Sequence, residues 1–254
     1  MAKIVAVHSF RGGTGKSNLV ANLATSIALQ GQRVGIVDTD IQSPGIHVLF
    51  GLDETQIDYT LNDYLWGNCP VQETAYDVSS VLQQELPEEA AIGKIYLIPS
   101  RLQAGEIVTV LSEGYDVDIL NTGFRDLIAS LNLDYLFIDT HPGLNEETLL
   151  SIGISDVLVI ILRPDYQDYQ GTAVTVEVAE ELEVPEMFMV VNKVLSDVDM
   201  DALKQQVGKT YQMPVAAVLP LCDEMVRLAS RSIFCLRYPE HTFTKKLYKI
   251  ADQI

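Results

Sequence analysis

A glycine-rich segment near the N-terminus is the feature that most limits what this chain can fold into. It reads HSFRGGTGKSN and separates a β-branched apolar run (Lys3–His8) from a helical pattern (Lys16–Gln30). Glycines permit positive φ angles and let backbone N–H groups approach an anion, and the N-terminus of the next helix adds its dipole. The segment matches the end of the pattern G-x-x-x-x-G-K-[ST], but His8, Ser9 or Phe10 would have to stand in for its first glycine.

This strand–loop–helix context predicts a phosphate-binding loop. In such a loop Lys16 reaches the β- and γ-phosphates of a nucleotide, and the hydroxyl of Ser17 can ligate Mg²⁺. The alternative is a glycine-rich turn that binds nothing, which the flanking strand and helix disfavour. The residues expected around the phosphates are Gly12, Gly13, Thr14, Gly15, Lys16, Ser17 and Asn18.

The rest of the chain alternates short apolar runs with helical patterns, which predicts parallel βαβ units in an α/β fold. The predicted strands are Lys3–His8, Val34–Asp38, Ile95–Ile98, Tyr135–Asp139, Val157–Leu162 and Met187–Asn192. The predicted helices are Lys16–Gln30, Gly123–Leu131, Glu146–Ile152, Gln170–Leu182 and Asp199–Lys209. We expect one domain over residues 1–254, a three-layer, doubly wound, mostly parallel sheet flanked by helices. We interpret the polar segment 67–93 as a surface excursion.

Composition narrows the class of protein further. Apolar residues make up 48% of the chain and charged residues 20%, which is typical of a globular protein. The net charge of −18 argues against a chain that coats nucleic acid over its whole surface. Cys69, Cys222 and Cys235 lie far apart, which fits no zinc spacing and favours a reducing compartment. The N-terminus shows no signal peptide, and no apolar run reaches the ~18 residues of a membrane span.

Acidic side chains follow two predicted strands. Asp38 and Asp40 lie in VGIVDTD and Asp139 lies in LFIDTHPG, so all three belong at the carboxyl edge of the sheet, where ligands bind in open α/β sheets. Carboxylates there can hold Mg²⁺ or orient an attacking water, whereas a lone one is often a helix cap. Asn192 ends a later strand and either contacts a purine edge or is a plain turn residue.

Together these segments resemble the ParA/MinD family of deviant-Walker-A ATPases, in the SIMIBI class of P-loop proteins. The resemblance spans nearly the whole chain and rests on RGGTGKS, VDTDIQSPG, FIDTHPG, VVNK and LPLCDE. It implies that Asp40 positions the hydrolytic water and that Asp38 and Asp139 form the Mg²⁺ shell. It also implies an adenine pocket formed by Asn192, Pro220 and Asp223, and an ATP sandwiched between two protomers.

One position departs from the family pattern. The family reads K-G-G-x-G-K-[ST], and its signature lysine reaches the partner's phosphates, but Arg11 stands at that place here. Arginine is a permanent cation that forks onto phosphate oxygens, so Arg11 could act in trans, although the swap is not conservative. Otherwise another basic residue bridges the phosphates. In having a non-standard residue at this position, the chain is similar to McdA, the carboxysome-positioning branch of the family.

The C-terminal end of the chain is basic, whereas the rest of the chain is acidic. Residues 227–254 carry a net charge of +4 and the rest of the chain −22. This suggests a local anion-binding face, although a solvated helical surface would look the same. In ParA-type relatives such residues bind DNA without sequence preference. The DNA-binding candidates are Arg227, Arg231, Arg237, Lys245, Lys246 and Lys249.

The last predicted helix, Thr242–Ile254, has an apolar face formed by Phe243, Leu247, Ile250 and Ile254. Such a face is usually core packing, but in MinD-type relatives a C-terminal amphipathic helix binds membrane. We expect this face to pack in the core rather than to bind membrane.

The resemblance thus predicts a cytoplasmic, nucleoid-associated, Mg²⁺-dependent ATPase that forms an ATP-dependent homodimer and binds nonspecific DNA. A cargo-bound adaptor protein would stimulate its hydrolysis, and the cargo could be a plasmid, a chromosome region or a compartment such as a carboxysome. Two alternatives stay open: a MinD-type ATPase that rides on membrane, and an ATP-binding scaffold with little hydrolysis.

Overall fold

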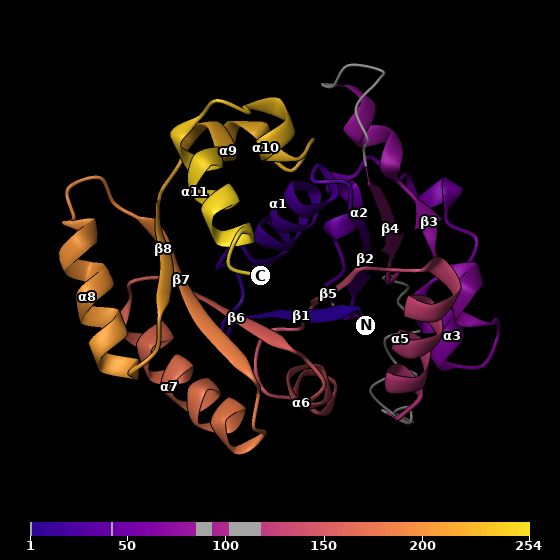
Figure 1. Cartoon of the computed structure of the whole chain (residues 1–254), viewed down its shortest axis with the longest axis horizontal. Helices are drawn as coiled ribbons and strands as arrows, with labels where there is room; N and C mark the ends of the chain where they lie inside the picture. The colour runs from indigo at the N-terminus through magenta and orange to yellow at the C-terminus, as the bar shows by residue number, and fades with distance from the viewer. Residues whose placement is uncertain (1, 42, 85–92, 102–117) are drawn as a thin grey trace.

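The computed structural model describes residues 2–41, 43–84, 93–101 and 118–254. One sheet, of order β3-β4-β2-β5-β1-β6-β7-β8, runs through this part of the chain (Figure 1). Its strands are β1 (Lys3–His8), β2 (Arg33–Asp38), β3 (Tyr76–Asp77), β4 (Lys94–Ile98), β5 (Tyr135–Asp139), β6 (Val157–Leu162), β7 (Glu186–Val194) and β8 (Val215–Pro220). All neighbours are parallel except β3, which runs antiparallel to β4.

The order of the strands positions the site. β1 lies between β5 and β6, while the next strand in sequence, β2, lies on the far side of β5. The sheet therefore reverses its winding beside β1, and open α/β sheets bind ligands beyond the carboxyl ends of strands at such a point. The segment between β1 and the first helix begins there.

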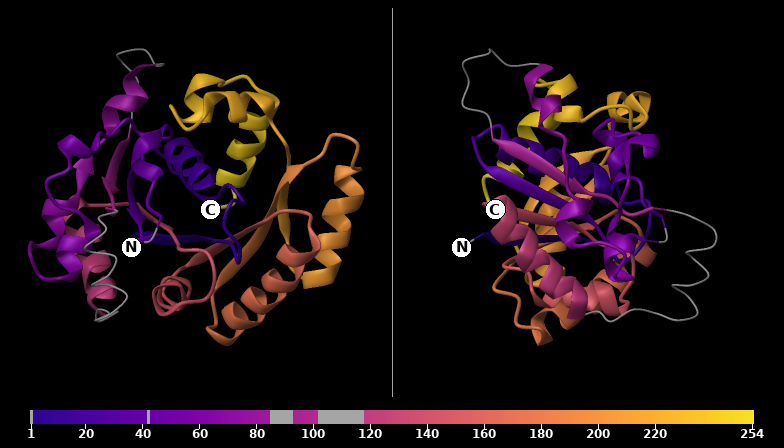
Figure 2. Two further views of the ribbon diagram at one scale, coloured as in Figure 1. Left: turned by 180° about the vertical axis from the view of Figure 1, so that it is seen from behind. Right: turned by 90° about the vertical axis from the view of Figure 1, so that its right-hand side faces the viewer.

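Helices cover both faces of the sheet (Figures 1 and 2). The α-helices are α1 (Lys16–Ala28), α2 (Ile46–Leu49), α3 (Leu61–Leu65), α5 (Asp118–Leu131), α6 (Glu146–Gly153), α7 (Tyr166–Glu181), α8 (Met200–Tyr211), α9 (Asp223–Leu228), α10 (Phe234–Arg237) and α11 (Thr242–Ala251). The 3₁₀ helices are η1 (Glu54–Gln56), η2 (Val71–Thr74) and η3 (Ser79–Gln84). Across the described ranges, no helix meets both the length and the hydropathy that a membrane span requires.

Alternation along the strands divides the core into two layers. Val5 and Val7 of β1 pack in the cluster that contains α1, α10 and α11, whereas Ala6 packs in the cluster formed with α7 and α8. On the same face as α7 and α8, β2 and β5 pack against α3 and α5. Buried side chains alternate between faces because successive residues of a strand point to opposite sides. The predicted three-layer α/β fold is confirmed.

The apolar face of α11 lies in the core. Phe243, Leu247 and Ile250 are each at most 4% exposed, and the helix packs along α1 and β8. The same helix presents Lys245 and Lys249 to solvent. The packing interpretation of this helix therefore holds, and the face that a membrane helix would use is already occupied.

The structure differs from the sequence predictions in several places, among them the short helices α2, α3, α9 and α10, which were not predicted. The segment 67–93 is not a mere surface excursion: β3 extends the sheet, and Val71, Val78 and Leu82 are buried, although residues 85–92 lie outside the described ranges. β8 was missed because the run VAAVLP is short and rich in alanine, which has weak strand propensity. Helices α5 and α7 begin several residues before the predicted starts.

Candidate functional site

The glycine-rich segment forms a loop between the end of β1 and the start of α1. Gly13 and Gly15 have φ angles of 75° and 98°, a region that side-chain-bearing residues rarely adopt, and Gly15 caps the helix. The helix opens with Lys16 and Ser17, so its N-terminal amides and dipole face the loop. This is the geometry in which a helix N-terminus binds phosphate groups.

Two residues at the end of β7 hold the loop in place. The amide of Asn192 donates to the carbonyl oxygen of Thr14 at 2.8 Å, and the ammonium of Lys193 donates to that of Gly13 at 2.7 Å. A Cβ atom on Gly15 would lie 2.7 Å from the amide nitrogen of Asn192, so only glycine fits there. The sequence VVNK thus supplies two contacts to the loop, of which the sequence analysis predicted neither.

Lys16 and Asp139 form a buried ion pair. Their side chains are 7% and 1% exposed, and Nζ lies 3.1 Å from Oδ1. The predicted phosphate-binding lysine therefore points at a predicted Mg²⁺ ligand in this structure. A buried pair of this kind needs both charges, because removing one leaves the other uncompensated.

Asp38 lies beside Asp139 on the neighbouring strand, at the same register. Burial raises the pKa of Asp38 well above its usual range, and the nearby Asp139 and Asp40 raise it further. Its carboxylate accepts backbone hydrogen bonds from Asp40 and Gly45, at 3.0 and 3.2 Å. Because a divalent cation would relieve this repulsion, the carboxylates fit Mg²⁺, and the hydroxyl of Ser17 at the start of α1 is a further ligand of the right type.

Asp40 follows the end of β2 and contacts the segment after β5. Its Oδ1 accepts from the backbone N–H of Ser43 at 3.1 Å and lies 2.6 Å from Nδ1 of His141. The structure therefore brings together Asp38, Asp40 and Asp139, as predicted. His141 is an additional member that the sequence analysis did not single out, although it lies within the quoted segment FIDTHPG.

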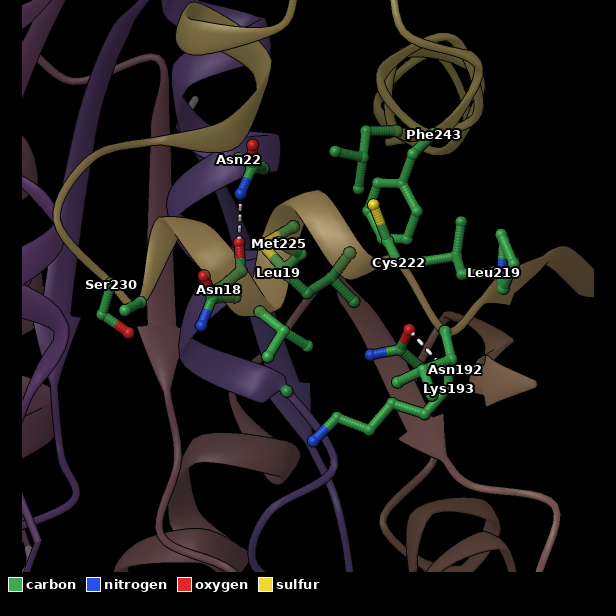
Figure 3. A pocket seen from close by; sticks show the side chains of 16 residues that line it. Asn18, Leu19, Asn22, Asn192, Lys193, Leu219, Cys222, Met225, Ser230 and Phe243 are labelled. Carbon is green, nitrogen blue, oxygen red and sulfur yellow. Dashed lines mark hydrogen bonds between the residues drawn. The ribbon is translucent and has the colours of Figure 1, made fainter. Parts of the chain in front are cut away.

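A pocket of about 270 Å³ lies beside the loop. Figure 3 shows Asn18 and Asn22 of α1 on one side, Asn192 and Lys193 on another, and Phe243 of α11 above them. Apolar side chains complete its lining: Leu19, Leu219, Leu221, Met225, Val226 and Leu247. The predicted Asn192 and Pro220 line this pocket, whereas the predicted Asp223 is exposed at the start of α9 and is not among the lining residues.

Arg11 is bound within its own chain. Its guanidinium donates to the side chain of Gln167, and Nε lies 4.0 Å from Oδ1 of Asp168, which is 2% exposed. The ring of Phe10 packs against Gly171, where a Cβ atom would lie 1.9 Å from the ring. The start of the loop is therefore docked on the first turns of α7, and Arg11 keeps 41% of its side chain exposed.

A Cys–Glu–His cluster lies next to the pocket. Cys222, Glu224 and His241 have potential metal-binding atoms within 4.8 Å of one another. However, Nδ1 of His241 accepts from the N–H of Phe243 as the cap of α11, so the ring proton belongs on Nε2, the nitrogen that faces Glu224 at 3.8 Å. With its proton on Nε2, His241 offers no free ring nitrogen to a metal ion.

The basic C-terminal residues have different environments. Arg227 on α9, Arg231 between α9 and α10, and Arg237 on α10 are all exposed. Arg231 and Arg237 line the same pocket. Lys245 pairs with Glu240 at 3.2 Å. Lys246 is half-buried, donates to the carbonyl oxygen of Val218 at 2.7 Å, and has its pKa lowered by burial. It is therefore a structural residue and a poor candidate for DNA.

The reversal of winding at β1, the loop at its carboxyl end and the helix behind it define the class of protein, a P-loop NTPase fold. The family profile described as AAA domain (AAA_31) matches residues 2–202. The chain belongs to this family, and the resemblance to ParA/MinD ATPases is confirmed.

Similar proteins agree with this assignment. The chain is 25% identical to an uncharacterized ATP-binding protein of Methanocaldococcus jannaschii, over 100% of this chain and 88% of the relative. Its fold is similar to the cell division ATPase MinD of Pyrococcus furiosus, with a TM-score of 0.81, 21% identity and coverage of 100% and 98%. It is also similar to a Cyanothece McdA–ATP complex, with a TM-score of 0.76, 18% identity and coverage of 100% and 97%.

Proposed function

We propose that this chain is a Mg²⁺-dependent ATPase that dimerises on ATP, binds DNA without sequence preference, and positions or partitions an intracellular cargo. The observation that carries the proposal is the meeting of Lys16, at the start of α1, with the carboxylates of Asp38, Asp40 and Asp139. Structural neighbours described as an ATP complex and as a Mg-ADP complex support the choice of nucleotide. We take residues 1–254 as one ATPase domain.

The chain's own groups supply most of what phosphoryl transfer to water needs. The loop amides and the ammonium of Lys16 balance phosphate charge, and Asp40 orients the attacking water. Ser17, Asp38 and Asp139 would hold Mg²⁺, which would supply positive charge to the phosphate groups. The purine base would enter the pocket beside Asn192 and Pro220, whose apolar walls suit a flat ring.

Calorimetry and phosphate release test the ATPase. ATP with saturating Mg²⁺ should bind the wild-type protein and should not bind Lys16→Ala, and phosphate release should fall to a small residual rate in Asp40→Asn. No heat of ATP binding would refute the proposal as a whole. Binding with a release rate that Asp40→Asn leaves unchanged would instead favour the nucleotide-binding scaffold.

Arg11 is our candidate for the cation that reaches the partner's phosphates. It has the charge and the exposure for this role, and its contacts with Gln167 and Asp168 would have to be exchanged for phosphate oxygens. Lys193 is the nearest described alternative, since its ammonium already lies on the loop. Light scattering of Arg11→Ala and Lys193→Ala with ATP compares the two.

The DNA-binding surface in this proposal consists of Arg227, Arg231, Arg237 and Lys249, which we call the basic surface. All four side chains are exposed. Such contacts go to phosphates, so they ignore sequence and weaken steeply with salt. The acidic remainder of the chain would confine DNA to this side.

Electrophoretic retention of nonspecific duplex DNA tests this surface, with ATP, ADP and no nucleotide compared. Arg231→Ala combined with Arg237→Ala should weaken ATP-dependent retention, while Lys245→Ala is the matched control because Glu240 already pairs with it. Pelleting with anionic liposomes and no DNA retention would favour the membrane-riding alternative. The buried apolar face of α11 makes that the less favoured outcome.

A cargo-bound adaptor that stimulates hydrolysis, and a nucleoid-associated location in the cytoplasm, complete the proposal. They follow from the family relationship and from the similarity to a cell division ATPase and to McdA. The experiment is phosphate release with DNA and candidate adaptors added in turn. An adaptor of the proposed kind would raise the rate only when DNA and ATP are both present.

A further inference from the structure

The contact between His141 and Asp40 joins two segments that lie 101 residues apart in the chain. Nδ1 of His141 is 2.6 Å from Oδ1 of Asp40, a short hydrogen bond between two side chains that are 21% and 13% exposed. Hydrogen bonds to ionised groups are shorter and stronger than those between neutral groups, and this contact lies at the short end. The contact spans the carboxyl ends of β2 and β5, directly beside Asp38 and Asp139.

This contact fixes one oxygen of Asp40 and leaves the other available. Oδ1 accepts from His141 and from the N–H of Ser43, while no hydrogen bond within the described residues involves Oδ2. A carboxylate held in this way has a defined plane and a free acceptor directed away from its support. Such an acceptor suits a residue that must hold a water molecule in one orientation.

His141 is itself anchored on both sides. Its carbonyl oxygen accepts from the hydroxyl of Thr148 on α6 at 3.2 Å. The preceding residue, Thr140, donates its hydroxyl to the carbonyl oxygen of Val7 at 3.0 Å, so the segment after β5 is tied to β1. The imidazole is therefore presented from a rigid support rather than from a free loop. Because the carboxylate accepts, the ring proton belongs on Nδ1.

We propose that His141 is a positioning residue for hydrolysis, which orients Asp40 so that its free oxygen holds the attacking water. The inference rests on the proposed ATPase function and adds to it a residue outside the motif that defines the loop. Without His141, Asp40 would keep only the Ser43 contact on its side chain and would rotate, and small misplacements of reacting groups cost up to about 10²-fold in rate. ATP binding would remain, because His141 is not among the residues that line the pocket, and its hydrogen bonds within the described residues go to Asp40 and Thr148.

The test compares His141→Leu with His141→Asn. Asparagine carries an N–H donor near the place of Nδ1, whereas leucine fills similar space without a donor. We expect His141→Leu to lower kcat for ATP roughly 10- to 100-fold with KM changed less than about twofold, and His141→Asn to recover most of the loss. In an Asp40→Asn background, His141→Leu should have little further effect, because residues that act as one unit are not additive.

The outcomes separate this inference from the proposed function. If the wild type hydrolyses ATP and His141→Leu matches its kcat, or if His141→Asn is as slow as His141→Leu, His141 does not position Asp40, and the ATPase proposal stands. If the wild type binds Mg²⁺-ATP but releases no phosphate with or without DNA, both fail. Thermal denaturation of each variant shows whether a lower kcat reflects lost folding.

Discussion

The buried imidazole of His8 makes the stability of the ligand-free protein depend on pH. His8 ends β1, directly before the loop, and its side chain is 0% exposed. Its Nδ1 lies 2.8 Å from the hydroxyl of Thr140, and its Nε2 is buried without a partner among the described residues. Burial, followed by the charges of Lys16 and His141, lowers the pKa of His8 from 6.5 to about 3.

The sign of the effect follows from where the proton binds. Below pH 6.5 the unfolded chain protonates this histidine, while the folded chain keeps it neutral down to about pH 3. Stability is therefore complete above pH 6.5 and is lost as the pH falls toward 3. For these two pKa values, the loss between pH 7 and pH 5 is about 2 kcal/mol from this residue alone.

Chemical denaturation of the wild type and of His8→Asn at pH 7, 6 and 5, without nucleotide, measures this contribution. Asparagine can keep the donor to Thr140 but cannot take up a proton. Since the carboxylates titrate alike in both proteins, the wild type should lose about 2 kcal/mol more than the variant between pH 7 and pH 5. Parallel curves for the two proteins would refute the reasoning, whatever their absolute stabilities.

Four further substitutions test the loop and the basic C-terminal end. Gly15→Ala should abolish ATP binding in calorimetry and cost about 1–3 kcal/mol of stability, because the residue has a positive φ and its Cβ atom would meet Asn192. Arg11→Ala should leave ATP affinity within about threefold and prevent ATP-dependent dimers in light scattering; an unchanged dimer would exclude it as the bridging cation. Lys246→Met should lower the free energy of unfolding by about 1 kcal/mol without changing DNA retention. Lys249→Met should weaken DNA retention and leave the free energy of unfolding unchanged.

The fold could be predicted largely because its central strands are covered on both faces. The run VLVIIL in β6 is buried at every position, and a continuous apolar run of this kind predicts a strand whatever the flanking sequence is. β8 lies at the edge of the sheet and contains Ala216 and Ala217, so the same signal fades there. In α7 the first turn is polar, and its start is set by the side chain of Asp165, which caps the N–H of Asp168.

Some parts of the site depend on short sequence motifs, and others depend on contacts between residues far apart in the chain. The loop, Asp38 and Asp139 could be predicted because their chemistry lies within short motifs at the ends of strands. The contacts of Arg11 with Gln167 and of His141 with Asp40 join residues 156 and 101 positions apart. No periodicity or motif encodes such a pairing, so only the folded chain reveals it. Lys246 shows the opposite error, since a lysine counted by charge proves to be part of the packing.

The pairing of Lys16 with Asp139 couples nucleotide and metal binding. For Lys16 to reach phosphate oxygens, Asp139 must lose its partner, and a buried carboxylate beside Asp38 is costly when it is unpaired. Phosphate at Lys16 and Mg²⁺ at Asp139 together compensate both charges. Either ligand alone leaves the other residue of the pair as an uncompensated buried charge. We therefore expect ATP to bind at least about tenfold more weakly in EDTA than in Mg²⁺. The difference should shrink in Asp139→Asn, whose amide carries no charge to compensate. Equal affinity with and without Mg²⁺ in the wild type would show that the ion pair does not link the two ligands.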